Sequence, residues 1–218
     1  MDLGVVRDAL PLLLKGLVVT VVLTLAGSGL ALVLGQALAF FRLSGSRLLR
    51  AVSGAYVDFV RGTPLLIQLF ALYFGAPQLG IDLSPLAAGI LGLGLNGAAY
   101  VAEVLRAGIL SVPKGQWEAA SALGMGPLLA LRRVILPQAY RIALPPLTGS
   151  LVALLKDTSL VSTITVVELT RQAQTLISSS YRAVELYLAA AALYFALTWP
   201  LLKLAERLER RLARGEAR

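Results

Sequence analysis

The sequence predicts an all-α protein that crosses a membrane several times. The chain has 218 residues, of which 57% are hydrophobic and 15% are charged, and its mean hydropathy is +0.78. Soluble domains carry about 25% charged residues, so a soluble protein of this length is unable to bury so much apolar surface. Uncharged runs of membrane-spanning length recur along the chain. We therefore expect one polytopic membrane domain over residues 1–218.

Five spans are predicted, at about residues 14–42, 57–77, 83–106, 140–167 and 184–206. The first contains the longest uncharged run, with 26 residues. In this span, Gly27, Gly29 and Gly35 provide a small-residue face on which another helix packs closely. Pro64 is expected to kink the second span or to mark its first turn.

The distribution of basic residues predicts the orientation. Residues 42–61, 106–141 and 203–218 together hold 15 of the 20 Lys and Arg residues. With five spans, these three segments lie on the same side of the membrane, and basic residues concentrate on the cytoplasmic side. The N-terminus is therefore expected outside and the C-terminus in the cytoplasm, as in a multi-pass protein of the cytoplasmic (inner) membrane.

The loop at residues 107–139 is too polar to cross a bilayer and is predicted to contain two short helices. Ser111 is expected to cap the first helix, with Pro113 in its first turn. Gly124 is expected to end this helix in a left-handed conformation, and Gly126-Pro127 begins the second. An apolar stripe in the second helix is followed by a proline that stops or kinks the chain: Leu128, Leu131, Val134, Ile135 and then Pro137.

The first helix of this loop presents very small side chains. Ala119, Ala120 and Ala122 leave a surface on which another protein can approach the backbone closely. Arg132 and Arg133 complement acidic groups or anionic lipid. The alternative interpretation is an ordinary cytoplasmic loop with amphipathic helices.

Polar residues inside two spans are candidates for a solute path. Asn96, Tyr100 and Glu103 follow a spacing that puts them on one helical face. Polar groups at membrane depth are costly unless they face protein or water, so this face indicates a path for solute. For Glu103 the alternative is an interfacial ion pair with Arg106, one turn further along the helix.

The fourth span is interrupted by the adjacent charges Lys156 and Asp157, followed by Thr158 and Ser159. Transporters place solute where a helix is broken near the membrane midplane. Asp157 or Glu103 suits an ammonium group, and Lys156 or the hydroxyls suit a carboxylate. Free carboxylates favour a cationic solute, whereas neutralisation of Asp157 by Lys156 removes that preference. The alternative is a neutral pair that only packs helices together.

Polar residues also lie at the start of the second span. A gate or pore lining is predicted there from Asp58, Arg61, Thr63, Pro64 and Gln68. The alternative for Asp58 and Arg61 is a structural ion pair at the membrane edge.

Several functions are disfavoured by what the sequence omits. Without cysteine there are no disulfide bonds or thiol chemistry, and without histidine the commonest metal ligand and general base is missing. No nucleophile is paired with a base, and no GxxxxGKS or GxxxxGKT motif is present to bind ATP. The basic residues lack an interleaved aromatic platform for nucleic acid. We expect no catalytic site, metal site or cofactor in this chain, and no nucleic acid partner.

The loop carries a long pattern that resembles a known family. Glu118-Ala119-Ala120, then Gly124, Val134 and Leu136-Pro137 at their spacing, resemble the EAA loop of ABC importer permeases. Isoleucine is more usual where Val134 stands. Residues 58–66, 156–160 and 166–170 are similar to the branch of this family that carries polar amino acids, and the resemblance extends from the first span to the fifth.

The resemblance implies a type I ABC importer permease fold in which the loop forms a coupling helix that docks on a cytoplasmic ATPase. The coupling residues that it implies are Gly115, Glu118, Ala119, Ala120, Gly124, Leu136 and Pro137. The solute-binding residues favoured with it are Asn96, Tyr100, Glu103, Lys156, Asp157, Thr158 and Ser159.

The same resemblance implies the partners. Two ATPase subunits bind ATP and Mg, a second permease is either a copy or a paralogue, and an extracytoplasmic binding protein delivers the amino acid. Membrane lipid surrounds the spans, and the chain itself is a transport subunit without enzymatic activity.

Two other functional classes compete with this interpretation. One is a self-contained secondary transporter or channel driven by an ion gradient, which has no use for an ATPase-docking loop. The other is a membrane anchor for a cytoplasmic complex, which does not need the buried charges Lys156 and Asp157.

Overall fold

A computed structural model describes residues 3–216, and this part of the chain consists of helices and turns without a strand. The α-helices are α1 (Leu3–Leu43), α2 (Arg47–Gly62), α3 (Leu65–Phe70), α4 (Pro85–Leu110), α5 (Lys114–Ala122), α6 (Pro127–Ala130), α7 (Leu136–Asp157), α8 (Leu169–Ser180) and α9 (Ala183–Glu216). Tighter or wider helical turns extend three of them: π-helical turns at Ala71–Gly75 and Leu131–Ile135, and 3₁₀ turns at Ala76–Leu79 and Thr158–Ile164.

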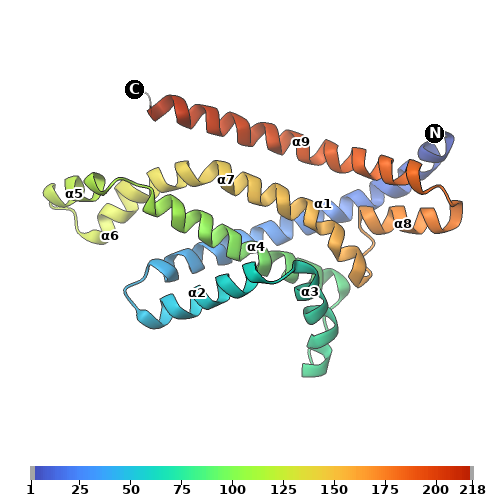
Figure 1. Ribbon diagram of the computed structural model, residues 1–218, viewed down its shortest axis with the longest axis horizontal. Coiled ribbons are helices and arrows are strands. Elements are labelled where there is room, and N and C mark those ends of the chain that lie inside the picture. The colour runs from blue at the N-terminus through green and yellow to red at the C-terminus, as the bar shows by residue number, and fades with distance from the viewer. Residues whose placement is uncertain (1–2, 217–218) are drawn as a thin grey trace.

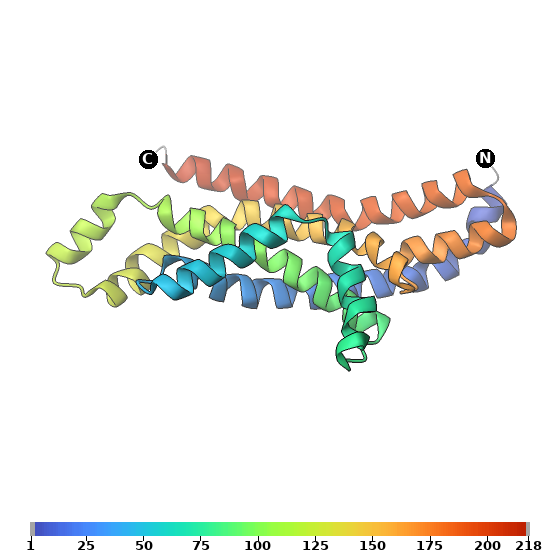
Figure 2. The same ribbon diagram turned by 60° about the horizontal axis from the view of Figure 1, so that its bottom comes forward.

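The helices form an elongated bundle. Helices α1, α4, α7 and α9 run along its long axis, while α3 turns away from it (Figures 1 and 2). The start of α1 and the end of α9 lie at opposite ends. The α1–α2 turn, helices α5 and α6, and the end of α9 lie toward the same end, so the three segments rich in basic residues are grouped together (Figure 1).

Within residues 3–216, three helices, α1, α4 and α9, are long and apolar enough to cross a membrane. Two bent helix pairs bring the number to as many as five if each pair counts as one span. One pair is α2 with residues 65–79, bent by 108°, and the other joins Pro127–Ile164 to α8 with a bend of 49°. The prediction of an all-α polytopic membrane protein is therefore confirmed.

Both end helices extend beyond the predicted apolar segments. Helix α1 includes Arg7, Asp8 and Lys15, and α9 continues through the charged tail to Glu216. A change from apolar to charged residues marks the edge of a membrane but does not interrupt backbone hydrogen bonds, so the helix continues.

Close packing of α1 on α4 forms the centre of the bundle, and it is the most extensive helix contact in the described chain. A Cβ atom on Gly35 would lie 2.6 Å from the Cβ of Val101, and one on Gly27 would lie 3.1 Å from the Cβ of Leu93. Gly29 has no such neighbour within 4 Å. The predicted small-residue face is therefore confirmed for Gly27 and Gly35, whereas Gly29 lies outside the contact.

The second apolar segment is sharply bent rather than straight. Helix α2 ends at Gly62, Thr63 and Pro64 adopt extended backbone conformations, and α3 restarts the helix at Leu65. Proline lacks the N–H that would continue the ladder, and it disfavours a helical conformation in the residue before it. The kink predicted at Pro64 is thus present.

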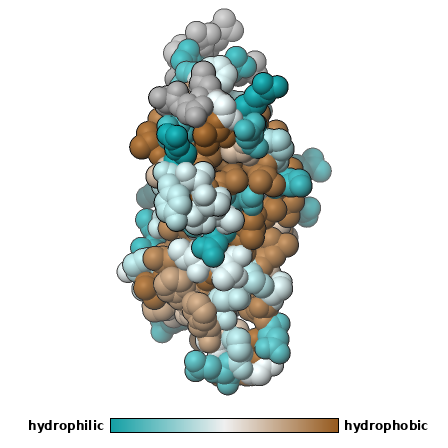
Figure 3. Space-filling view, turned by 90° about the vertical axis from the view of Figure 1, so that its right-hand side faces the viewer, coloured by the Kyte–Doolittle hydropathy of each residue, from teal (hydrophilic) through white to brown (hydrophobic). Residues whose placement is uncertain are grey.

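The end of the bundle at α8 carries mixed side chains. Figure 3 looks at the molecule from this side, and hydrophilic and hydrophobic residues lie next to one another there. Ser178, Ser179 and Arg182 are exposed, and so are Tyr181 and Val184.

Candidate functional site

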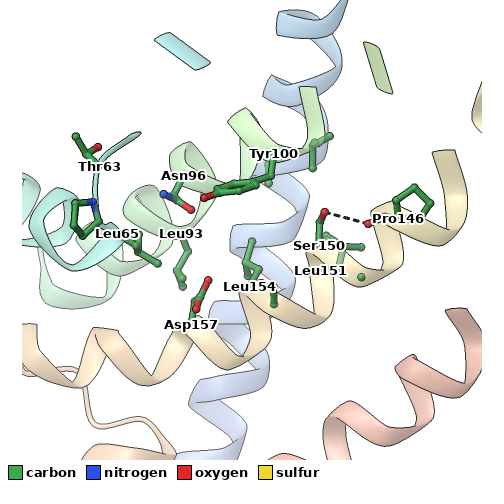
Figure 4. Close-up of a pocket in the computed structure, with 16 residues that line it drawn as sticks. Thr63, Leu65, Leu93, Asn96, Tyr100, Pro146, Ser150, Leu151, Leu154 and Asp157 are labelled. Atoms are coloured by element: carbon green, nitrogen blue, oxygen red, sulfur yellow. Dashed lines mark hydrogen bonds between the residues drawn. The ribbon is translucent and has the colours of Figure 1, made fainter. Parts of the chain in front are cut away.

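A cavity of about 560 Å³ lies between α4, α7 and the bend that joins α2 to α3. Thr63, Pro64 and Leu65 line it from the bend. Helix α4 contributes Leu93, Asn96, Gly97, Tyr100 and Val101, and α1 contributes Ala31. Helix α7 contributes Pro146, Gly149, Ser150, Leu151, Ala153, Leu154 and Asp157 (Figure 4).

Five polar side chains line this cavity: Thr63, Asn96, Tyr100, Ser150 and Asp157. Asn96 and Tyr100 extend from α4, one helical turn apart, and Asp157 faces them from the last residue of α7 (Figure 4). Asp157 forms no ion pair within residues 3–216, and the adjacent Lys156 is exposed and does not line the cavity. A carboxylate without a cationic partner, facing an amide and a phenol, suits a solute that carries an ammonium or guanidinium group.

The predicted interruption of the fourth span is a change of helix type at Asp157, whereas the bend of 49° comes later, between Pro127–Ile164 and α8. Helix α7 ends at Asp157, and a 3₁₀ turn follows from Thr158 to Ile164. The hydroxyls of Thr158 and Ser159 donate to the carbonyl oxygens of Leu155 at 2.6 Å and Lys156 at 2.8 Å. Neither hydroxyl lines the cavity. Of the four predicted residues at this break, only Asp157 reaches the cavity, because a helical turn directs neighbouring side chains to different sides.

Glu103 lies outside the cavity although it shares a helical face with Asn96 and Tyr100. Its carboxylate is bound by Arg42 from α1, at 2.6 Å, and by Arg106 from the next turn of α4. The interfacial pair with Arg106 is therefore present, with Arg42 as a second cation. This arrangement ties the end of α1 to α4.

The five candidate gate residues occupy different positions around the bend. Thr63 and Pro64 line the cavity, and Gln68 contacts it indirectly by accepting a hydrogen bond from Asn96 at 3.0 Å. Asp58 is exposed. The Arg61 guanidinium lies 5.7 Å from the centre of the Tyr100 ring, within the range of a cation–π contact. Among residues 3–216, Arg61 forms no ion pair with Asp58.

The coupling-loop candidates lie at the opposite part of α4, around α5 and α6 (Figure 1). Glu118, Ala119 and Ala122 are exposed on α5, whereas Ala120 is buried against the chain. Gly115 is exposed as well. The predicted alanine surface is therefore narrower than expected, because a helix of this length turns one of its alanines inward.

The ends of these helices agree in part with the predictions. Gly124 has φ = 75°, which confirms the left-handed end of α5, and Pro127 begins α6. The predicted cap at Ser111 is wrong: its hydroxyl donates to the Ala107 carbonyl at 2.8 Å, at the end of α4. Pro113 occupies the N-cap position of α5 without a side-chain hydrogen bond.

The second helix of the loop continues directly into α7. Pro137 does not stop the helix: it lies in the first turn of α7, which follows the preceding helical turn without a gap. A π-helical turn at Leu131–Ile135 precedes α7 and joins it to α6. Within the predicted stripe, Ile135 is buried, Leu131 and Val134 are partly buried, and Leu128 is exposed. Leu136, the next residue, is partly buried.

Sequence reasoning missed the role of Glu168, which was noted only as part of residues 166–170, a segment that resembles the family. Its side chain is fully buried and caps α8 by accepting hydrogen bonds from the backbone N–H groups of Thr170 and Arg171, at 2.9 and 2.8 Å. Tyr194 on α9 donates a third hydrogen bond at 2.7 Å. An acidic residue directly before an amphipathic run was the available signal.

Within the described residues, no group of three His, Cys, Asp or Glu side chains has the arrangement of a metal site.

Comparison with known proteins assigns the chain to a family. The family model described as "Binding-protein-dependent transport system inner membrane component" matches residues 27–214. The L-cystine transport system permease protein TcyB of Bacillus subtilis (strain 168) is 41% identical over 209 residues, which are 95% of this chain and 89% of that protein. The glutamine transport system permease protein GlnP of Escherichia coli (strain K12) is 38% identical over 213 residues, which are 97% of each chain.

Solved structures agree. A crystal structure of an amino acid ABC transporter with histidines matches with a TM-score of 0.91 and 39% identity, over 97% of this chain and 99% of that one. The MetNI methionine ABC transporter in an inward-facing conformation matches with a TM-score of 0.80 at 21% identity, over the same shares, which shows the fold alone. The chain belongs to the family of inner membrane components of binding-protein-dependent transport systems, and it is a transport permease rather than an enzyme.

Proposed function

We propose that this chain is the permease subunit of an ABC importer that carries polar amino acids across the cytoplasmic (inner) membrane. The main support for this proposal is the cavity at the end of α7. There Asp157 faces Asn96 and Tyr100 and forms no ion pair in the described chain. An anchor for a cytoplasmic complex has no need of such a carboxylate, because a buried acidic group without a partner destabilises a membrane protein.

The proposed solute contacts are narrower than those predicted from the sequence. Asp157 receives a cationic nitrogen of the amino acid, and the amide of Asn96 and hydroxyl of Tyr100 complete the polar contacts. Glu103 is engaged by Arg42 and Arg106, so it holds helices together rather than contacting solute. Lys156, Thr158 and Ser159 support the break in the helix. Because Lys156 forms no ion pair with Asp157 and does not line the cavity, a solute with a cationic side chain is favoured over an acidic one.

The partners follow from the family. Two ATPase subunits bind ATP and Mg on the cytoplasmic side, a second permease completes the path, and an extracytoplasmic binding protein delivers the amino acid. Glu118, Ala119 and Ala122 are exposed on α5 and form the surface that contacts the ATPase. Gly115 and Gly124 shape the ends of that helix, and Leu136 and Pro137 connect it to α7. The N-terminus lies outside, and the five spans are those predicted from the sequence.

The direct connection between this loop and the cavity suggests how transport is driven. Helix α6, the π-helical turn and α7 form one nearly continuous helix from the ATPase surface to Asp157. A movement of α5 and α6 caused by ATP binding is therefore transmitted along α7 to the cavity. Opening and closing of the cavity toward the two sides of the membrane then alternates with the ATPase cycle.

The test is uptake by the complete importer in proteoliposomes, with Asp157→Asn compared with the wild type. We expect the variant to reduce uptake at least tenfold, since a charge-assisted hydrogen bond of about 1.5–3 kcal/mol is lost. Asp58→Asn is the matched control, because Asp58 is exposed and does not line the cavity. Unchanged uptake by Asp157→Asn, or uptake that persists without ATP, would contradict the proposal, and the second result would favour a secondary transporter.

A further inference from the structure

Gln68 joins the bend between α2 and α3 to the cavity. Its side-chain nitrogen donates to the carbonyl oxygens of Val60, at 2.9 Å, and Thr63, at 3.2 Å, and to the Thr63 hydroxyl oxygen at 2.8 Å. Its side-chain oxygen accepts a hydrogen bond from the Asn96 amide nitrogen at 3.0 Å. Both polar atoms of this partly buried amide are therefore engaged.

The bond to Val60 has a specific cause in the backbone. In an uninterrupted helix, the carbonyl of Val60 would accept from the N–H of the fourth residue onward, which is Pro64. Proline has no N–H, so this carbonyl loses its helical donor. Gln68 supplies the missing donor from its side chain and so stabilises the 108° bend.

The same contacts determine which way the Asn96 amide faces. Carbonyl oxygens only accept hydrogen bonds, so Gln68 must present its NH₂ group to Val60 and Thr63 and its oxygen to Asn96. That oxygen is also only an acceptor, so Asn96 must present its NH₂ group to Gln68. The Asn96 side-chain oxygen is then left on the side of Tyr100 (Figure 4).

This orientation gives the cavity a definite hydrogen-bonding character. The Asn96 oxygen and Asp157 carboxylate both accept hydrogen bonds. The Ser150 hydroxyl donates its hydrogen to the Pro146 carbonyl at 3.1 Å, which leaves its oxygen as an acceptor (Figure 4). These three acceptors, beside the Tyr100 hydroxyl, which both donates and accepts, suit a group rich in N–H donors, such as an ammonium or guanidinium.

We propose that Gln68 is a positioning residue for solute selection: by holding Asn96 as an acceptor, it sets the preference of the cavity for a cationic nitrogen donor. The inference rests on the proposed role of the cavity as the solute site. Gln68 does not contact the solute; it acts through Asn96, and it also braces the bend. The two effects are separable by substitution: the bend loses its support when the side-chain nitrogen is removed, whereas Asn96 keeps an acceptor as long as residue 68 has a side-chain oxygen facing it.

Two substitutions make that separation. Gln68→Met is close in size and removes every hydrogen bond, so Asn96 becomes free to turn over and present its NH₂ group. Gln68→Glu retains an oxygen acceptor for Asn96 but loses the NH₂ group that faces Val60 and Thr63, and its added negative charge also favours a cationic solute. The matched control is Gln78→Met, because Gln78 is exposed on the same segment, outside the cavity.

The measurement is the rise in unfolding temperature that each of the twenty common L-amino acids produces in the permease–ATPase complex. The complex is held in lipid nanodiscs without the binding protein, so that the cavity alone selects. N-acetylated forms of the amino acids that respond tell whether the α-ammonium or a cationic side chain is the donor. The unfolding temperature without solute shows independently whether the bend between α2 and α3 has lost stability.

We expect the wild-type complex to favour solutes with a free cationic nitrogen. In the Gln68→Met complex, the apparent affinity for solutes with a free cationic nitrogen, divided by that for solutes without such a nitrogen, should fall about tenfold. Gln68→Glu should lower the unfolding temperature yet retain the ranking, and Gln78→Met should change neither. A Gln68→Met complex that keeps the wild-type ranking would overturn this inference alone. A wild-type complex that responds to none of the twenty would overturn the proposed cavity function, and this inference with it.

Discussion

The carboxylate of Glu168 and the hydroxyl of Tyr194 are joined by a 2.7 Å hydrogen bond that ties the start of α8 to α9. The N–H of the next residue, Leu169, donates to the Thr20 hydroxyl on α1 at 3.2 Å. One end of α8 is thus fixed to both the first and the last long helix. A buried acidic side chain with three hydrogen-bond donors is stable there, and it makes this junction sensitive to single substitutions.

Replacing Glu168 with alanine should destabilise the protein by about 2–4 kcal/mol, because a helix cap and a hydrogen bond to a buried acid are lost together. Tyr194→Phe should cost about 1–3 kcal/mol. Unfolding in mixed detergent micelles measures both, and the double variant should lose less than the sum of the two. Strictly additive losses would mean that the two side chains do not stabilise each other.

The contact between α1 and α4 predicts opposite results for two glycines of the same helix. Gly35→Ala should destabilise by about 1–3 kcal/mol, because its Cβ would overlap the Val101 side chain. Gly29→Ala is the matched control and should be neutral or stabilising by less than about 1 kcal/mol, because it has open space and alanine favours a helix. Equal unfolding temperatures for the two variants would show that the helices are not packed this closely.

Glu103 should act as a structural residue. Glu103→Gln should lower stability by about 1–2 kcal/mol, since Arg42 and Arg106 lose their shared carboxylate in a partly buried position. Solute-induced stabilisation of the complex should stay at the wild-type level. Glu209→Gln, at an exposed position on α9, is the control for loss of an acidic residue. A change in solute ranking for Glu103→Gln would instead return this residue to the solute path.

Glu118→Lys should abolish ATP-driven uptake in proteoliposomes while leaving the permease folded, because the charge of an exposed coupling residue is reversed. Binding of solute to the cavity should persist, since Glu118 lies on α5 and does not line the cavity. Lys114→Glu tests whether any charge reversal on α5 has the same effect. Normal uptake by Glu118→Lys would count heavily against the coupling role.

Several local features were predictable because they depend on a few neighbouring residues. The left-handed end at Gly124, the helix start at Pro127 and the kink at Pro64 all follow from restrictions that glycine and proline place on their own backbone. The interruption at Asp157 was also visible, because charges stand out in an apolar run. Ser111 was assigned to the wrong helix because its hydroxyl is near the ends of both α4 and α5, and only the actual backbone decides which group it reaches.

The cavity was predictable only in outline. Asn96 and Tyr100 were expected on one helical face, and both line the cavity. Glu103 shares their face but is drawn away by Arg42, which is 61 residues earlier in the chain. The bond between Gln68 and Asn96 spans 28 residues, and sequence spacing gives no information about such a contact.

The resemblance of residues 107–139 to the EAA loop indicated a permease with an ATPase partner, and the sequence by itself determined a helical membrane protein with a polar loop and charges within its fourth span. Those properties come from composition and from short-range backbone preferences, which act wherever the residues occur. Only the tertiary structure decided that Asp157 is left without a cation while Glu103 has two, and that Gln68 directs the amide of Asn96. These outcomes depend on which helices lie together, since charges and hydrogen bonds act over a few ångströms in space, whatever the separation along the chain.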